Sequence, residues 1–263
     1  MISQCVKDVL VEYSFVFILG AIFGSFLNIL IVRLPLNKSV IFPSSKTLCC
    51  KKKIKFYHNI PLFSYLFLKG KCAYCKSNYS FIYFFVELFS ACISLYIIVV
   101  YGLTFNSIVL LVLFYTLLVL SFIDLKYKAV PDYLLIIALV LALLFKFDNI
   151  IEAFKNAFLF AGAISLLLVF LNFYIQNIKA KILKNKELKT QEALGEGDIV
   201  IFAIIGIILG IKAGLFAIFL ASIFAILPAL YLHFKCKEYQ TPFIPFLFLG
   251  LICEFVFNIS KVF

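Results

Sequence analysis

The sequence has little charge, because only 14% of its 263 residues are Asp, Glu, Lys or Arg. A soluble domain of this length needs more polar side chains to cover its surface. This shortage argues against a soluble enzyme, a disordered protein and a secreted disulfide scaffold. Hydrophobic residues make up 65% of the chain, and the mean hydropathy is +1.12. The apolar runs are long and continuous, unlike the short alternating segments of a membrane β-barrel. The composition therefore predicts an all-α, polytopic membrane protein in contact with the lipid bilayer.

Acidic residues are scarcer than basic ones, with 13 against 24, which gives a net charge of +11. A charge of this sign can indicate nucleic-acid binding, but the placement of the basic residues argues against it. Nineteen of the 24 lie in four segments that separate apolar runs: 33–76, 126–128, 179–189 and 235–237. Basic residues gathered in alternate loops, all on one side of the membrane, follow the positive-inside rule. We therefore place these four segments in the cytoplasm and predict no nucleic-acid partner.

The apolar runs predict about eight transmembrane helices. They lie at 14–32, 81–101, 104–123, 131–147, 154–177, 199–232 as two short spans, and 243–260. Lys212, between Gly210 and Gly214, marks the turn expected inside the 199–232 run. An even number of spans puts both termini on the same side, the outside. The first run has no positively charged segment before it and no A-x-A-like site after it. We therefore expect it to be a retained membrane anchor and not a cleaved signal peptide.

The segment 34–80 is the one stretch that reads as a small extramembrane domain, because it is polar, rich in lysine and without Asp or Glu. We therefore expect three parts: 1–33 with the first span, the cytoplasmic loop domain 34–80, and a seven-helix catalytic domain over 81–263.

Four cysteines lie in the loop domain: Cys49, Cys50, Cys72 and Cys75. The cytosol keeps thiols reduced, which favours a metal site over disulfides. The spacing of Cys72 and Cys75 allows two thiolates to bind one Zn²⁺ from a tight turn, so we predict a structural zinc site from these four residues. Four reduced cysteines without a metal remain the alternative.

Carboxylates in or beside membrane spans are costly and mark candidate sites. Glu87 and Glu254 lie inside predicted spans, where hydrogen bonding between helices is the commoner role. Asp124 and Asp198 reach the same membrane face from the ends of two spans. Two carboxyl groups held close together share a proton, so that one can activate a water while the other donates a hydrogen bond to a scissile carbonyl. Asp132 follows a proline at the start of a span and suits the first turn of a helix.

Other membrane hydrolase chemistries lack their motifs in this sequence. There is no H-E-x-x-H for an intramembrane zinc protease and no G-x-S-x-G for a serine hydrolase.

The motifs together resemble the type IV prepilin peptidases, the leader peptidase and N-methyltransferase family of type IV pilus, type II secretion and competence systems. The matching segments are GSFLNILIVRLP at 24–35, NIPLFSYLFLKGKCAYC at 59–75, D-x6-P-D at 124–132, GEGD at 195–198 and PFIPF at 242–246. The resemblance implies that Asp124 and Asp198 are the catalytic pair and that Asp132 is not catalytic. It also implies cleavage after a Gly, and S-adenosylmethionine-dependent methylation of the new N-terminus.

Some positions depart from the family pattern. Thr47 stands where the first C-x-x-C pair would begin, and Cys49 lies beside Cys50 instead, so Cys49 or His58 would have to complete the zinc site. Ile82, Val200 and Ile244 replace the expected Arg, Lys and Gly, and none of these changes removes a catalytic carboxylate. No glycine-rich motif for S-adenosylmethionine is visible, so no residue is assigned to that cofactor.

We therefore expect an aspartic endopeptidase of the bacterial inner membrane that cleaves the short basic leader from type IV prepilins and pseudopilins at the cytoplasmic face. Three alternatives remain open. The first is a peptidase without methyltransferase activity. The second is an ion-coupled transporter that uses Asp124 and Asp198 as proton sites, although no related halves are found. The third is a non-catalytic, zinc-bearing membrane scaffold, which would leave the paired aspartates unexplained.

Overall fold

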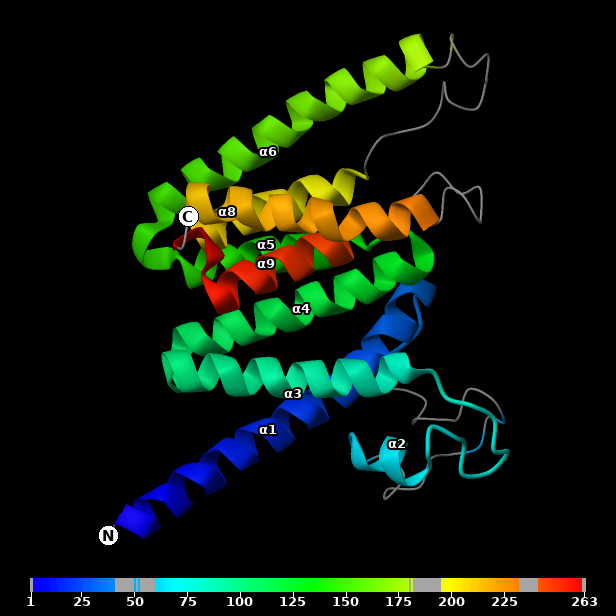
Figure 1. Ribbon diagram of the computed structural model, residues 1–263, viewed down its shortest axis with the longest axis vertical. Coiled ribbons are helices and arrows are strands. Elements are labelled where there is room, and N and C mark those ends of the chain that lie inside the picture. The colour runs from blue at the N-terminus through cyan, green and yellow to red at the C-terminus, as the bar shows by residue number, and fades with distance from the viewer. Residues whose placement is uncertain are drawn as a thin grey trace. The chain divides into compact units, whose positions relative to one another are not determined.

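The computed structural model describes residues 2–40, 50, 52, 60–179, 181, 195–231 and 241–261. These residues form helices and one isolated β-bridge, with no named strand among them. The α-helices are α1 (Ile2–Arg33), α2 (Phe63–Phe67), α3 (Phe81–Tyr101), α4 (Phe105–Tyr127), α5 (Asp132–Phe145), α6 (Ile150–Phe173), α8 (Glu196–Tyr231) and α9 (Ile244–Phe257) (Figure 1). Single-turn helices are η1 (Leu34–Leu36), η3 (Phe147–Asn149) and η7 (Ile259–Lys261), and η4 (Tyr174–Lys179) is a π-helix. The predicted all-α class is confirmed.

Five stretches of the described chain are long and apolar enough to cross a membrane: Val11–Leu36, Phe81–Tyr101, Phe105–Tyr127, Phe147–Asn177 and Glu196–Tyr231. The apolar helices α5 and α9 have 14 residues each. At 1.5 Å per residue each is about 21 Å long, which is shorter than the hydrocarbon core of a bilayer. The chain is therefore a multi-pass membrane protein whose helices differ in length.

Helix α8 is broken near its middle. Gly210 has φ 76° and ψ −171°, a backbone conformation that a residue with a side chain rarely adopts. Figure 1 shows the first half of α8 in yellow and the second half in orange running back beside it. The break lies at the turn that the sequence predicts between two short spans.

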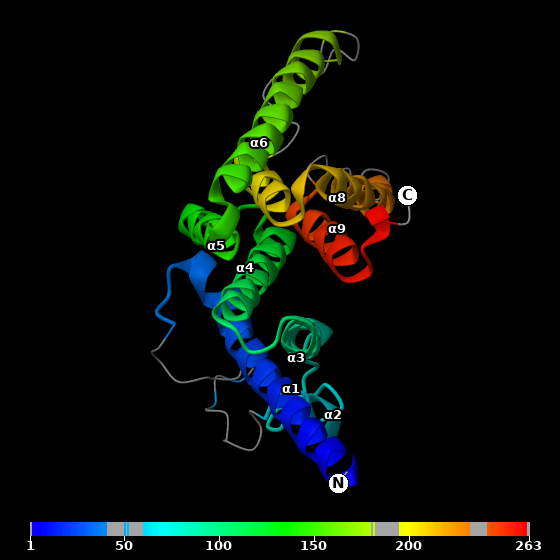
Figure 2. The same cartoon turned by 90° about the vertical axis from the view of Figure 1, so that its left-hand side faces the viewer.

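Residues Met1–Val119 form one compact unit, in which α1 packs against α3 (Figure 2). The two helices come close at Gly20, where a Cβ atom would lie 2.8 Å from the Cα of Ala91. The hydroxyl of Ser90 donates a hydrogen bond to the carbonyl of Gly20 at 2.9 Å. A small residue and a polar side chain thus join the two apolar helices, as is common where helices pack in membranes.

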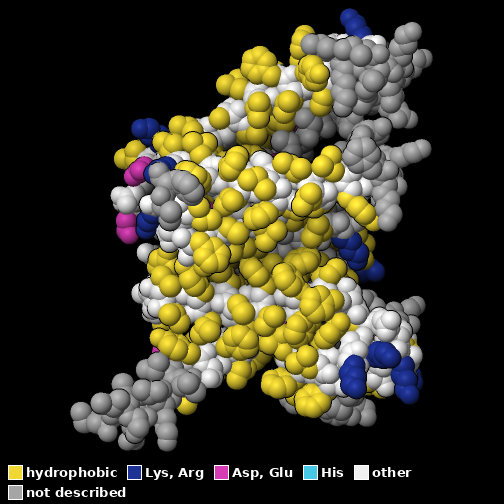
Figure 3. Space-filling view, in the orientation of Figure 1, with side chains coloured by type: hydrophobic (Ala, Val, Ile, Leu, Met, Phe, Trp, Pro, Cys, Tyr) yellow, Lys and Arg dark blue, Asp and Glu magenta, His cyan; other side chains and the backbone are white. Residues whose placement is uncertain are grey.

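Residues Leu120–Phe263 form the second compact unit, in which α8 packs against α5, α6 and α9. A Cβ atom at Gly250 of α9 would overlap the backbone of Ala217 in α8, so these two helices are in close contact. Hydrophobic side chains also cover much of the outer surface of the helices (Figure 3). Such a surface suits contact with lipid rather than with water.

Candidate active site

Asp124 lies in the last turns of α4, and its side chain is only 7% exposed. The backbone N–H of Ile244 donates a hydrogen bond to its Oδ2 atom at 3.2 Å, and the backbone of Phe243 also hydrogen-bonds the carboxylate. Both donors stand at the N-terminus of α9, where the orphan N–H groups and the helix dipole favour a negative charge. The PFIPF segment therefore holds the carboxylate of Asp124.

Asp198 lies in the first turn of α8 and is 6% exposed. The backbone N–H of Gly195 donates to its Oδ2 atom at 3.0 Å. The side chain thus reaches back to the residue that caps its own helix, as the acidic residue of a capping box does. Gly197 is in contact with neighbouring elements, because a Cβ atom there would lie 2.9 Å from the Cγ2 of Val130 and 3.2 Å from the Cδ1 of Leu135. The GEGD segment thus packs closely against the start of α5 at this glycine.

The two aspartates belong to the same compact unit, and their carboxyl groups interact electrostatically. The rings of Phe202 and Phe243 stack with centroids 6.2 Å apart, which ties the second turn of α8 to the start of α9. Three segments far apart in the sequence thus meet around two buried carboxyl groups. Two such groups can share a proton and so offer one base and one acid at the same place.

Of the three other acidic residues that the sequence singles out, Glu254 and Glu87 accept backbone N–H groups and Asp132 is exposed. Asp132 is the first residue of α5 and is exposed, as expected of a first-turn residue. Glu254 is buried, and its two carboxylate oxygens accept the backbone N–H of Ser260 at 3.1 and 3.2 Å. Glu87 in α3 accepts the backbone N–H of Leu62 at 2.8 Å.

The first-span motif stabilises the end of α1. The side-chain amide of Asn28 donates to the carbonyl of Tyr83 in α3 at 3.0 Å. Arg33 Nη1 donates to the carbonyls of Ser39 and Val40 at 3.0 and 3.1 Å. These polar residues therefore hold the chain where it leaves the first apolar helix and enters the loop.

The loop brings three of the predicted metal ligands together. The sulfur atoms of Cys50, Cys72 and Cys75 lie within 4.8 Å of one another, and Cys50 and Cys72 are 4.0 Å apart. Thiolates that share one tetrahedral Zn²⁺ at Zn–S distances of about 2.3 Å are about 3.8 Å apart, so the donor set fits zinc. Cys49 and His58, the candidate fourth ligands, lie outside the described residues.

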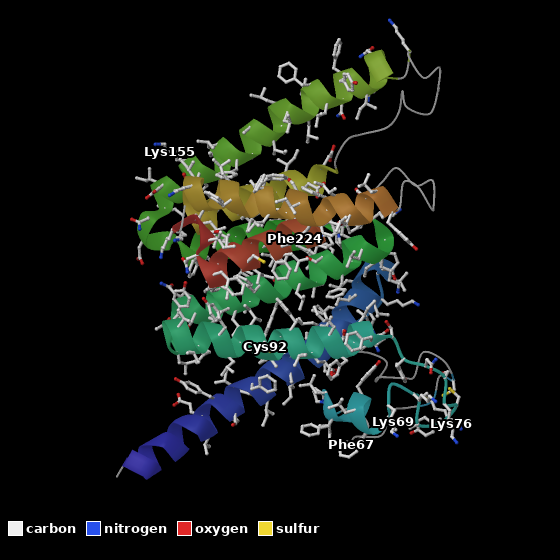
Figure 4. The ribbon with its side chains drawn as sticks, viewed as in Figure 1. Phe67, Lys69, Lys76, Cys92, Lys155 and Phe224 are labelled. Carbon is white, nitrogen blue, oxygen red and sulfur yellow. The ribbon has the colours of Figure 1, made fainter. Side chains whose placement is uncertain are left out.

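A tight turn presents two of these thiols. Lys71 and Asn78 form an antiparallel bridge, and the backbone N–H of Cys72 donates to the carbonyl of Ser77 at 2.8 Å. Lys76 has a left-handed backbone with φ 56°, which closes the turn. The local fold thus directs Cys72 and Cys75 to one point, as the sequence spacing predicts. Cys92, by contrast, is exposed on α3 away from the loop (Figure 4).

Two family models match the chain in succession. The bacterial peptidase A24 N-terminal domain matches residues 18–101, and the type IV leader peptidase family matches residues 111–230. Among similar proteins, a prepilin leader peptidase/N-methyltransferase of Vibrio cholerae is 31% identical over 84% of this chain and 86% of its own length. The chain belongs to the type IV leader peptidase family.

Other proteins similar to this chain are also named prepilin leader peptidase/N-methyltransferase. The Bacillus subtilis protein is 28% identical over 95% of this chain and 96% of its own. The Myxococcus xanthus protein is 32% identical over 79% of this chain, which spans 59% of that protein's length. No solved structure matches the chain. The family therefore covers both compact units of this leader peptidase homologue.

The sequence did not predict which groups of this leader peptidase homologue hold Asp124. The donors are the backbone N–H groups of Phe243 and Ile244. The type of a residue does not reveal that its backbone N–H binds a carboxylate. The only available signal was the PFIPF segment itself, where a proline near the first position of an apolar run marks a helix start.

Proposed function

We propose that this chain is a membrane aspartic endopeptidase that removes the leader peptide of type IV prepilins and pseudopilins. Its membership of the type IV leader peptidase family and the names of its relatives support the activity and the substrate class. The single observation that carries the assignment of the site is the pair of buried, electrostatically interacting carboxyl groups of Asp124 and Asp198.

The reaction follows from two carboxyl groups in different protonation states. The ionised one takes a proton from a water molecule, whose oxygen attacks the scissile carbonyl while the protonated one donates a hydrogen bond to the carbonyl oxygen. The tetrahedral intermediate then breaks its C–N bond, and the departing amine takes up a proton. The N–H group of Ile244 binds Oδ2 of Asp124 and that of Gly195 binds Oδ2 of Asp198, so both carboxyl groups are held in place for the water and the substrate.

The chain is a multi-pass protein of the inner membrane, as its apolar helices and its family indicate. We further propose that both termini face outward, and that Asp124 and Asp198 lie at the cytoplasmic face with the 34–80 loop. The distribution of the basic residues supports this orientation. A prepilin, with a basic leader followed by a hydrophobic helix, would then place its scissile bond at the level of the two aspartates.

Two cofactors belong to the proposal. A structural Zn²⁺ would be held by Cys50, Cys72 and Cys75, with Cys49 as the fourth ligand, and would fix the loop between η1 and α3. S-adenosylmethionine would supply the methyl group for the new N-terminus, as the names of the relatives suggest. No residue of this chain is assigned to the binding of S-adenosylmethionine.

The test is co-expression with a prepilin, followed by mass spectrometry of the product's N-terminus. The proposal expects loss of the leader and a methyl group on the new first residue. Cleavage without the methyl group would support a peptidase that does not methylate. An intact prepilin beside a folded, inserted enzyme would contradict the proposed activity for that substrate class.

A further inference from the structure

Helix α2 has one face packed against a membrane span and one face exposed. The ring of Tyr65 packs against Phe81 and Phe84 of α3, with centroids 6.1 and 5.2 Å away. On the opposite side, the exposed fractions of Phe63, Leu66 and Phe67 are 58%, 61% and 82%. Positions i, i+3 and i+4 share a face of a helix, so these three side chains form one apolar surface, here called the α2 face.

The hydrogen bond between Leu62 and Glu87 fixes the level of α2 along α3. Glu87 lies six residues after Phe81, the first residue of α3, which corresponds to about 9 Å along the helix axis. The start of α2 therefore lies beside the first two turns of α3. Because α3 is long and apolar enough to span a membrane, we expect lipid headgroups to meet acyl chains near this level. The exposed α3 side chains at this level, such as Ile82 and Phe85, are also apolar.

Basic side chains follow directly after the α2 face. Lys69, Lys71 and Lys76 are exposed, and the whole 34–80 segment contains no Asp or Glu. Figure 4 labels Phe67 at α2 and the two flanking lysines, Lys69 and Lys76, along the adjoining loop. Figure 3 shows the dark-blue basic side chains gathered beside yellow hydrophobic ones in the same region. Aromatic and aliphatic side chains next to lysines are typical of segments that lie in the interface of an anionic membrane.

We propose that the α2 face inserts into the headgroup region of the bilayer and that Lys69, Lys71 and Lys76 bind the phosphates of anionic lipids. The loop would then be held by the membrane as well as by α3. The positive charge of this surface favours anionic lipid over the prepilin as its partner. The expected leader is basic, so a lysine-rich surface without acidic residues would repel it, whereas the same surface attracts anionic lipid.

The absence of tryptophan from the sequence provides a direct test. The substitution Phe67→Trp introduces a single tryptophan at a site that is 82% exposed, where the larger ring fits without repacking. The full-length variant would be reconstituted in vesicles of phosphatidylglycerol and phosphatidylcholine, with bromine on the acyl chains of one lipid or the other. Phe158→Trp, at a position 74% exposed within α6, serves as the lipid-facing reference variant.

The expected result for the Phe67→Trp variant is quenching of its fluorescence by brominated lipid and weak quenching by aqueous acrylamide. Brominated phosphatidylglycerol should quench this variant roughly twofold more strongly than brominated phosphatidylcholine at the same fraction. Changing three lysines together to Gln, namely Lys69, Lys71 and Lys76, should abolish this preference. Lys155→Gln, at an exposed position of α6, should leave the preference intact. The Phe158→Trp reference should respond to both brominated lipids.

Strong acrylamide quenching of the Phe67→Trp variant with no response to brominated lipid, while the reference variant responds, would overturn the proposal. The proposal would also be overturned if added prepilin protected the new tryptophan on α2 from acrylamide and lipid alone did not. The α2 face would then be a surface that binds substrate. Should Phe67→Trp fail to insert, Phe63→Trp on the same face replaces it and is judged by the same outcomes. None of these measurements depends on peptidase activity.

Discussion

The backbone N–H of Ile244 donates a hydrogen bond to the carboxylate of Asp124 at 3.2 Å, across 120 residues of sequence. The contact makes the first turn of α9 part of the site, although α9 supplies no catalytic side chain to it. The position of α9 therefore affects the orientation of Asp124. Since α9 packs on α8, which carries Asp198, this interface contributes to the position of Asp198 relative to the N–H group that binds Asp124.

Gly250→Ala tests this dependence. A methyl group there would overlap the backbone of Ala217, and backbone cannot move aside as a side chain can. We expect a loss of roughly 1–3 kcal/mol in stability and a clear loss of leader cleavage, because the start of α9 is displaced. Leu249→Ala changes an exposed neighbour on the same helix and should leave cleavage near the wild-type rate. The measurements are thermal unfolding in detergent and cleavage of a prepilin. Equal activity of both variants would contradict the role of the interface.

Gly197→Ala probes the contact between the GEGD segment and α5. The added Cβ would meet Val130 Cγ2 at 2.9 Å and Leu135 Cδ1 at 3.2 Å. The first turn of α8, which carries Asp198, shifts to the extent that these two side chains do not move aside. We expect cleavage to fall by up to about tenfold, since small misplacements of reacting groups are costly. Gly162→Ala in α6 is the matched control, because its Cβ would meet nothing within 4 Å. If the control lost as much activity as Gly197→Ala, the steric explanation would fail.

The sequence predicted the parts of this site that have side chains with a distinctive chemistry. Asp124 and Asp198 stood out because carboxylates are rare in apolar spans, and Cys72 and Cys75 because of their spacing. It also located the break of α8 near Lys212, which the structure places at Gly210. What it could not predict were long-range backbone contacts, such as the N–H of Ile244 on Asp124, because these depend on how helices pack. The three-part division into 1–33, 34–80 and 81–263 stays a prediction.

Cys72→Ser tests the proposed zinc site. Loss of one thiolate from three sulfur atoms that lie within 4.8 Å should weaken the binding of the metal. We expect about one zinc per chain in the purified wild-type protein. The variant should contain much less, and its loop should be cleaved faster by added protease. Cys92→Ser, which changes an exposed cysteine on α3, should keep the zinc. A wild-type protein without metal, whose loop is nevertheless protected, would contradict the site.

Reporter fusions test the proposed orientation. Fusions after Lys53 and Lys184 should report the cytoplasm, because both follow lysine-rich stretches. Fusions within 102–106 and 148–152 should report the outside. The second pair falls in the connections between α3 and α4 and between α5 and α6, so it samples both compact units. A cytoplasmic signal at 102–106 would change the number of spans between the loop and Asp124, and would separate the two aspartates across the membrane.

The central claim is that Asp124 and Asp198 together cleave the leader, and substitution of each by Asn tests it most directly. Asn keeps the size of the side chain and can still accept the N–H of Ile244 or Gly195, but it cannot exchange a proton. The measurement is the rate of leader removal from a co-expressed prepilin, with equal amounts of inserted enzyme. We predict a fall of about 10²- to 10⁴-fold or more for each variant, and near-normal cleavage for Asp132→Asn, whose side chain is exposed at the start of α5. Cleavage at the wild-type rate by either Asp124→Asn or Asp198→Asn would contradict the account.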